Sequence, residues 1–269
     1  MAAPCCPPGS HGPGETTAPT ELHGGDVTLD ATAALPKVSC YLSEPPEAST
    51  KAVILLHDIF GADSGRTKAI ADAYAAAGYI TVLPSVFREP LPTEREGLGM
   101  VLMVAGVVRT LYRNTWPHVG PQYKRVLQYL KEERFVTAVG LVGFCWGVYP
   151  MTHLLKDEEE PVLKAGLCFH PGLPVFAVTF DFNVKKYLAQ CTVPIAYLAA
   201  RNDPASTKPG GIADVAMRGK DAYEKCVFKP YKDMKHGWVN KGSLDDPKIK
   251  RDYEDALQVS FDFLEATLL

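Results

Sequence analysis

A cysteine between two glycines follows an apolar run near the middle of the chain. Cys145 lies in the segment Gly143–Gly147, directly after Val139–Val142 and before a helical pattern. A nucleophile between a buried strand and a helix is held in a strained turn, with its side chain pushed into the site. The glycines lack Cβ atoms, so strand and helix can approach closely. Backbone N–H groups and the dipole at the helix start favour a thiolate. The pattern predicts a nucleophilic thiol; the alternative is a buried cysteine in a tight turn.

Two residues that could activate this thiol come later in the chain. Asp203 lies just past the apolar run 195–200, and His236 lies a few residues past Val227–Tyr231. The order nucleophile, acid, histidine is that of α/β-hydrolases. In this order His236 takes the thiol proton, and Asp203 orients the imidazole and stabilises the imidazolium. Taken singly, Asp203 would be interpreted as a cap and His236 as a loop histidine. Together, each just past a strand, they predict a catalytic triad with Cys145.

A nucleophile of this kind also needs donors for the oxyanion that forms on the substrate. One donor is expected from the backbone N–H of the residue after the nucleophile, Trp146. The other is expected from the loop after an earlier strand, 57–61, where the donor is the N–H of Ile59. A further histidine, His170, also follows an apolar run. We interpret it as a structural histidine and leave it out of the triad.

These residues need a scaffold, and the chain alternates between two kinds of segment. Short runs rich in Val, Ile and Leu predict strands buried on both faces, at 52–56, 80–83, 139–142, 165–169, 195–199 and 227–231. Helical patterns lie between them, near 67–77, 121–133, 149–156 and 213–225, and an amphipathic helix closes the chain from about 247 to 268. The segments 27–29 and 38–42 predict an antiparallel edge pair. The fold class is therefore α/β, a mostly parallel central sheet with helices on both faces.

Composition excludes several classes of protein. The 269 residues contain 28 Lys+Arg and 31 Asp+Glu, a net charge of −3, which gives no basic field for a nucleic acid. The run 97–108 is too short to span a bilayer, and 135–155 is interrupted by glycine and proline. The first residues lack the basic start and apolar core of a secretory signal, and the cysteine count is odd, which favours free thiols. We expect a cytoplasmic protein without a membrane span.

The first 25 residues differ in composition from the rest. They contain five prolines and five glycines and almost no aliphatic side chains, so they are expected to form a flexible or surface-draped leader. The pair Cys5–Cys6 with His11 and His23 does not have the spacing of a metal site, and no metal or cofactor is expected. Residues 26–269 are predicted to form a single domain.

The segment 97–118 is apolar almost all round and ends with Arg109, Tyr112, Arg113 and Trp116. One interpretation is a buried packing helix. The second is an apolar lid over the site, with Arg109 or Arg113 meeting a substrate carboxylate. The third is a basic amphipathic helix at a membrane surface.

Taken together, these residues resemble the dienelactone hydrolase family, which includes carboxymethylenebutenolidase. The matching motifs are 58–61, 143–147, 202–203 and 236–238, and the similarity runs from about Ser39 to the C-terminus. The resemblance implies a single-domain α/β-hydrolase with a Cys-His-Asp triad and no cofactor. It implies hydrolysis of a small ester or lactone through an acyl-thioester. It leaves open whether the chain is a monomer or a dimer.

Three positions depart from the family pattern. Asp58 stands where the family usually has a glutamate, whose carboxylate pairs with the resting thiol and takes part in its activation. Asn240 stands where prototypes have an arginine that binds the carboxylate of the lactone; the neighbouring Lys241 could compensate. Val148 stands where the family commonly has a glycine, at the start of the helix that follows Cys145. Trp238, in the histidine motif, is a further candidate for binding substrate, as are Asn240, Arg109 and Arg113. These departures put a carboxylated dienelactone in question as the substrate.

Two other functions remain open. The same triad could act as a thioesterase or acyltransferase, and a non-catalytic interaction protein could retain the fold. An intact nucleophile, acid and histidine argue against the second of these.

Overall fold

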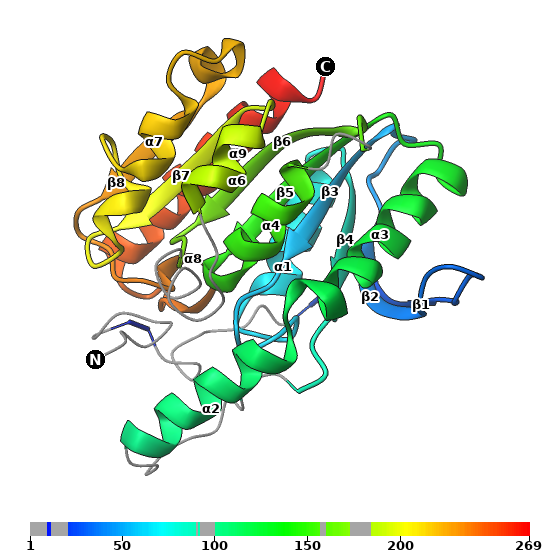
Figure 1. Cartoon of the computed structure of the whole chain (residues 1–269), viewed down its shortest axis with the longest axis horizontal. Helices are drawn as coiled ribbons and strands as arrows, with labels where there is room; N and C mark the ends of the chain where they lie inside the picture. Colours follow the sequence, from blue (N-terminus) through cyan, green and yellow to red (C-terminus); the bar gives the residue numbers. More distant parts are fainter. Residues whose placement is uncertain (1–9, 12–20, 90, 92–99, 157–159, 173–183) are drawn as a thin grey trace.

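An eight-stranded sheet forms the centre of the described structure (Figure 1), a computed structural model covering residues 10–11, 21–89, 91, 100–156, 160–172 and 184–269. Its strand order is β1-β2-β4-β3-β5-β6-β7-β8. The first two strands are antiparallel and form the edge pair predicted from sequence, while β3 to β8 run parallel. The strands are β1 Gly25–Leu29, β2 Val38–Ser43, β3 Lys51–Leu56, β4 Ile80–Pro84, β5 Ala138–Phe144, β6 Leu163–Phe169, β7 Ile195–Ala200 and β8 Val227–Tyr231.

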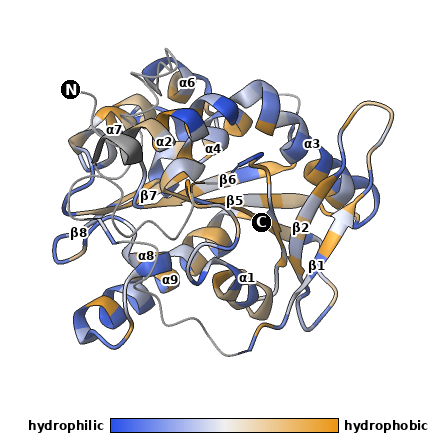
Figure 2. Ribbon diagram, turned by 90° about the horizontal axis from the view of Figure 1, so that it is seen from below, coloured by the Kyte–Doolittle hydropathy of each residue, from blue (hydrophilic) through white to orange (hydrophobic). Residues whose placement is uncertain are grey.

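Helices cover both faces of this sheet (Figure 2). One face carries α1 Thr67–Ala76, α8 Trp238–Lys241 and α9 Pro247–Thr267. The other carries α3 Trp116–Glu132, α4 Val148–Leu155, α6 Val184–Gln190 and α7 Ile212–Met217. On that side α2, Met100–Arg113, projects from the body (Figure 1). Short 3₁₀ turns complete the elements at η1 Cys145–Gly147, η2 Ala205–Thr207 and η3 Asp221–Lys225.

The apolar runs form the central strands because helices bury them from both sides. Every residue of β5 and of β7 is buried, and the side chains divide into two core clusters, one on each face of the sheet. Tyr74 and Phe263 lie in the cluster beneath α1 and α9, and Tyr123 and Met151 lie in the cluster beneath α3 and α4. The α/β class predicted from sequence is confirmed.

Some helices differ from the sequence prediction. The helix expected from residue 121 begins earlier, at Trp116, with Pro117 in its first turn, where a missing N–H is tolerated, and Pro121 lies inside it. The helix expected over 213–225 is wrong. It breaks into α7 and η3 around Gly219, whose φ of 81° leaves the helical region. Neither α6 nor α8 was predicted. No helix within the described part of the chain is long and apolar enough to cross a membrane.

Two described parts of the leader contact the domain. The N–H groups of His23 and Gly24 donate to the carboxylate of Asp72 on α1, at 3.0 and 3.1 Å. The N–H of His11 donates to the carbonyl of His236 at 2.9 Å. Residues 1–9, including Cys5 and Cys6, and residues 12–20 lie outside the described residues. The two contacts tie the leader to α1 and to the loop of His236.

Candidate active site

Cys145 lies directly after β5 in a strained turn between strand and helix, the elbow, which comprises residues 143–147. Its φ is 50°, in the left-handed region that a residue with a Cβ rarely adopts. Glycine is required on both sides of Cys145 because neighbouring backbone lies too close for a Cβ. A Cβ on Gly147 would lie 2.2 Å from the carbonyl oxygen of Leu56 on β3, and a Cβ on Gly143 would lie 3.0 Å from the backbone of Gly147. The Cys145 side chain is therefore pushed out at the carboxyl end of the sheet, with 2% of its surface exposed.

His236 and Asp203 form a buried pair at the same end of the sheet. Nδ1 of His236 lies 2.5 Å from Oδ1 of Asp203, and the side chains are 2% and 0% exposed. Oδ2 of Asp203 accepts from the N–H of Ala200 at 2.6 Å, and the N–H of His236 donates to Oδ1 of Asn202 at 2.7 Å. An ionised carboxylate only accepts hydrogen bonds, so Nδ1 carries the proton and Nε2 carries the lone pair in the neutral ring. This tautomer suits a general base.

His170, interpreted from sequence as structural, lies beside this pair. It follows β6, its φ is 39°, and its ring meets the ring of His236 edge-on with 4.9 Å between centroids. The parallel neighbours β5, β6, β7 and β8 thus carry Cys145, His170, Asp203 and His236 just past their carboxyl ends. The sequence signal for His170 was a histidine directly after a buried strand, whereas His236 lies a few residues past the end of β8. The adjacency of the two rings depends on strand order.

Two backbone N–H groups are available near the elbow. Ile59 is fully buried, and its N–H has no acceptor among the described residues, although its carbonyl accepts from Leu91 at 3.1 Å. Trp146 lies in the first turn of η1, where an N–H has no partner within the helix. A buried N–H without a partner is costly unless something binds it. Both groups fit the expected role of oxyanion donors.

Asp58, next to Ile59, is buried, accepts three hydrogen bonds and forms an ion pair. Oδ1 accepts from the N–H of Phe60 at 2.8 Å. Oδ2 accepts from Ser64 Oγ at 3.1 Å and from Asn240 Nδ2 at 3.0 Å, and it pairs with Lys241 Nζ at 2.5 Å. These contacts link the loop 57–61 to α8. The pairing of this carboxylate with the resting thiol, which the family resemblance implies, stays a prediction.

Arg66 and Gly65 hold α8 against the same loop region. The Arg66 guanidinium donates to the carbonyls of Val239, at 2.8 Å, and of Gly242, and the Arg66 N–H donates to the carbonyl of Asn240 at 2.9 Å. A Cβ on Gly65, whose φ is 56°, would lie 1.9 Å from that carbonyl oxygen. The short helix that follows the His236 loop is therefore fixed to the segment that follows the Ile59 loop.

Aromatic rings pack against Trp146, the residue after Cys145. The His57 ring stacks on Trp146 with 5.6 Å between centroids, and Phe87 meets both rings edge-on, at 4.6 and 4.5 Å. Burial lowers the pKa of His57, so its imidazole stays neutral. Its Nδ1 donates to the carbonyl of Asp58 at 2.7 Å. This packing surrounds the Trp146 side chain with aromatic rings.

The four residues expected to bind substrate have other contacts here. Arg109 and Arg113 on α2 both pair with Glu89 at the surface, Arg109 at 3.1 Å. Asn240 is buried and donates to Asp58. Trp238 is buried beside Tyr231 and His170, with ring centroids 5.1 and 5.5 Å away. The structure brings Asn240 and Trp238 to the site as supports of its loops, whereas Arg109 and Arg113 face Glu89.

Other thiols lie in surroundings that disfavour ionisation. Burial raises the pKa of Cys168 well above its usual range and raises that of Cys40 to about 12. Burial also raises the pKa of Cys191 and Cys226. In the part of the chain that the structure describes, no group of three His, Cys, Asp or Glu side chains is arranged to hold a metal ion.

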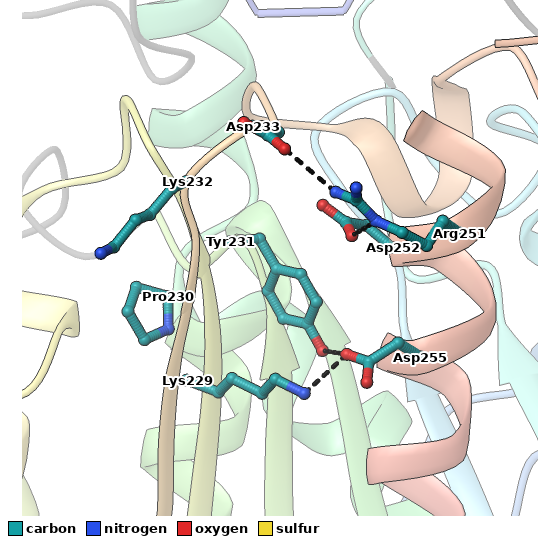
Figure 3. A pocket seen from close by; sticks show the side chains of 8 residues that line it. All are labelled: Lys229, Pro230, Tyr231, Lys232, Asp233, Arg251, Asp252 and Asp255. Atoms are coloured by element: carbon teal, nitrogen blue, oxygen red, sulfur yellow. Dashed lines mark hydrogen bonds and ion pairs between the residues drawn. The ribbon is translucent and has the colours of Figure 1, made fainter. Parts of the chain in front are cut away.

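A surface pocket lies away from this site, between β8 and α9 (Figure 3). Most of its charged groups are paired with one another: Lys229 and Tyr231 both contact Asp255, at 2.6 and 2.7 Å, and Arg251 contacts Asp233 at 3.0 Å. The lining residues are Lys229, Pro230, Tyr231, Lys232, Asp233, Arg251, Asp252 and Asp255. Apart from Lys232, these charges already satisfy one another.

The parallel sheet, the elbow after β5 and the residues past β7 and β8 define an α/β-hydrolase fold. Solved structures share it: the dienelactone hydrolase from Anabaena variabilis superposes with a TM-score of 0.62 at 13% identity, covering 92% of this chain and all of that one. Acylaminoacyl peptidase from Pyrococcus horikoshii superposes with a TM-score of 0.65 at 14% identity, covering 91% of this chain and 41% of that chain. At such identities the likeness concerns the fold.

Sequence comparison identifies the family. The model of the dienelactone hydrolase family matches residues 38–268, and the chain belongs to this family. The human carboxymethylenebutenolidase homolog is 25% identical over 226 residues, which cover 81% of this chain and 82% of that protein. The protein is therefore an enzyme of the ester and lactone hydrolase class, and its substrate is a small molecule.

Proposed function

We propose that this enzyme hydrolyses a carboxylic ester or lactone with Cys145 as the nucleophile and an acyl-thioester as the intermediate. The observation that carries the proposal is the 2.5 Å contact of His236 Nδ1 with Asp203, which leaves Nε2 as the proton acceptor at the end of the sheet where the strained elbow presents Cys145. The membership of the family agrees with it.

Acylation begins when Nε2 of His236 takes the proton of the Cys145 thiol. The sulfur attacks the carbonyl carbon, and the carbonyl oxygen becomes an oxyanion that accepts hydrogen bonds from the N–H groups of Ile59 and Trp146. The oxyanion then collapses, the C–O bond of the ester breaks, and the leaving alkoxide takes the proton from His236. From a lactone, the released alcohol stays attached to the acyl group.

Deacylation repeats these steps with water. His236 takes a proton from the water as its oxygen attacks the thioester carbon, and the same two N–H groups stabilise the second oxyanion. The C–S bond breaks, the carboxylic acid leaves, and the sulfur recovers the proton from His236. Asp203 holds the ring through both steps and stabilises the imidazolium.

In this proposal Asp58 acts on the oxyanion loop rather than by pairing with the thiol. Its carboxylate accepts from the N–H of Phe60, next to Ile59, and from Asn240 on α8, and it pairs with Lys241 on the same helix. The hydrogen bond from the Phe60 N–H to the Asp58 side chain closes a turn around the Asp58–Ile59 peptide, and this holds the direction of the Ile59 N–H. Asn240 and Lys241 complete that support. Because both residues contact Asp58, the proposal does not assign them to the binding of a substrate carboxylate.

The test is hydrolysis of 4-nitrophenyl acetate, a neutral lactone, a carboxylated lactone and an acyl thioester by the full chain. Cys145→Ala is expected to abolish turnover, and Cys145→Ser is expected to retain only weak activity. Cys226→Ala, which removes a half-buried thiol elsewhere, serves as the matched control and is expected to keep full activity.

Mass spectrometry of the acid-quenched enzyme is expected to find an acyl group on the peptide that contains Cys145. Turnover by Cys145→Ala at the wild-type rate would refute the proposal. A preference of at least a hundredfold for the acyl thioester would identify a thioesterase, and release of acyl groups only to added alcohols would identify an acyltransferase.

A further inference from the structure

Both backbone groups of His236 are held by segments outside its own loop. Its N–H donates to Asn202, and its carbonyl accepts from the N–H of His11 at 2.9 Å. His11 also packs on the next residue: its Cβ and its carbonyl oxygen each lie 3.6 Å from where a Cβ on Gly237 would be. A leader residue therefore contacts the peptide that joins His236 to Gly237.

That peptide needs an outside support. Gly237 adopts a φ of 91°, and glycine can leave this region at little energetic cost. Rotation of the peptide changes ψ of His236, and the imidazole moves with it. The 2.5 Å contact of Nδ1 with Asp203 leaves little room for such movement if Nε2 is to meet the thiol. A hydrogen bond to the His236 carbonyl opposes the rotation.

The leader is anchored on the domain beyond His11 as well. His23 and Gly24 donate to Asp72 through their N–H groups, and the Tyr41 hydroxyl donates to the same carboxylate at 2.8 Å. Asp72 lies on α1, on the sheet face that also carries α8 (Figure 2). The chain entering β1 is thus attached to the domain at His23 and Gly24.

We propose that the backbone N–H of His11 is a positioning group for the catalytic histidine, so that the leader completes the active site. The inference rests on the proposed function, in which His236 is the base. The hydrogen bond to the His236 carbonyl is donated by the main-chain N–H of His11, so the His11 side chain is not required for this hydrogen bond.

Two substitutions and two deletions distinguish the role of the His11 N–H from that of the His11 side chain and the rest of the leader. His11→Pro removes the N–H and keeps the segment, whereas His11→Ala, the conservative variant, keeps the N–H. Deletion of residues 1–11 removes the donor, and deletion of residues 1–9 keeps it and serves as the matched control.

His11→Pro and the longer deletion are expected to lower kcat for 4-nitrophenyl acetate by about three- to tenfold, the effect of one net hydrogen bond. KM is expected to change by less than about twofold, because the contact acts on the base rather than on substrate binding. His11→Ala and the shorter deletion are expected to stay within about twofold of the wild type. A Tm within a few degrees in all four variants would show that the effect is not a loss of folding.

Alkylation of the Cys145 thiol by iodoacetamide gives a second readout that needs no substrate. Its rate against pH reports the coupling of thiol and imidazole, and a merely structural contact would not shift this profile in a folded protein. The profile is expected to shift in His11→Pro and in the longer deletion, and to be unchanged in the other two variants.

Wild-type kcat and alkylation profiles in His11→Pro and in the longer deletion would overturn the proposal. An equal loss in His11→Ala and His11→Pro would also overturn it, because the side chain would then carry the effect. These outcomes are distinct from failure of the proposed function, which would appear as turnover in Cys145→Ala.

Discussion

Lys241 and Asp58 form an ion pair from which water is almost completely excluded. Lys241 Nζ lies 2.5 Å from Asp58 Oδ2, and the two side chains are 3% and 0% exposed. Lys241→Met removes the cation and keeps most of the volume of the side chain. Removing one partner of a buried pair leaves an uncompensated charge and typically costs about 3–5 kcal/mol.

The other contacts of Asp58 reduce this cost. Phe60, Ser64 and Asn240 still donate to the carboxylate after the substitution, so the loss is expected near the lower end of that range, about 3 kcal/mol. In a chain of this size, about 2–4 °C of Tm is lost per kcal/mol, which gives a fall of about 6–12 °C. Because Ile59 lies in the same loop, kcat is also expected to fall, by up to about a hundredfold.

Urea unfolding followed by circular dichroism measures the free energy, and a double-mutant cycle isolates the pair. Asp58→Asn in the Lys241→Met background removes the unpaired charge and is expected to restore more than half of the loss. Lys250→Met is the control, because the Lys250–Glu254 pair is 4.0 Å apart and about 60% exposed; it is expected to change stability by less than about 1 kcal/mol. A loss below about 1 kcal/mol in Lys241→Met would refute this account of the loop.

Three further predictions concern the site and its supports. Asp203→Asn is expected to lower kcat by about 10⁴-fold, because the tautomer with the proton on His236 Nδ1 is no longer favoured, and single-turnover ester hydrolysis measures it. Burial lowers the pKa of His153 from 6.5 to about 3, so below pH 6.5 the unfolded chain binds a proton that the folded chain does not. His153 is therefore expected to contribute about 2 kcal/mol to the fall in the free energy of unfolding between pH 7 and pH 5, in addition to the contribution of the buried, neutral His57. In urea titrations His153→Phe, which keeps a ring against Trp116, should make that fall smaller by about 2 kcal/mol. Gly65→Ala is expected to cost more than about 3 kcal/mol, since its Cβ would meet the backbone of Asn240, whereas Gly210→Ala, with open space at a φ of 79°, should cost only about 1–2 kcal/mol in the same measurement.

Local patterns in the sequence were sufficient for most of the fold. The fully buried strands β5 and β7 appear as continuous apolar runs, and helices on both faces follow from the alternation of strand and helix patterns. The break near Gly219 was missed because the residues on both sides of it suit a helix. The four-residue helix α8 is too short to give a periodic signal.

The sequence also indicated the candidate nucleophile, acid and base, because each is identified by its residue type and by its place just past a strand. That reasoning applies to Cys145, Asp203 and His236, because their order in the chain and the strands that precede them can be predicted without coordinates. It could not separate His170 from a structural histidine, since its place beside His236 depends on which strands are neighbours in the sheet.

The partners of Asp58 and the position of the leader were decided by the tertiary structure alone. Asp58 and Lys241 are 183 positions apart, and His11 and His236 are 225 apart, so no periodicity or motif connects them. Their contacts follow from how α8 packs against the loop after β3 and from where the leader crosses the His236 loop. Residue types and local spacing therefore determined which groups can do the chemistry, whereas long-range packing decided which groups hold them in place.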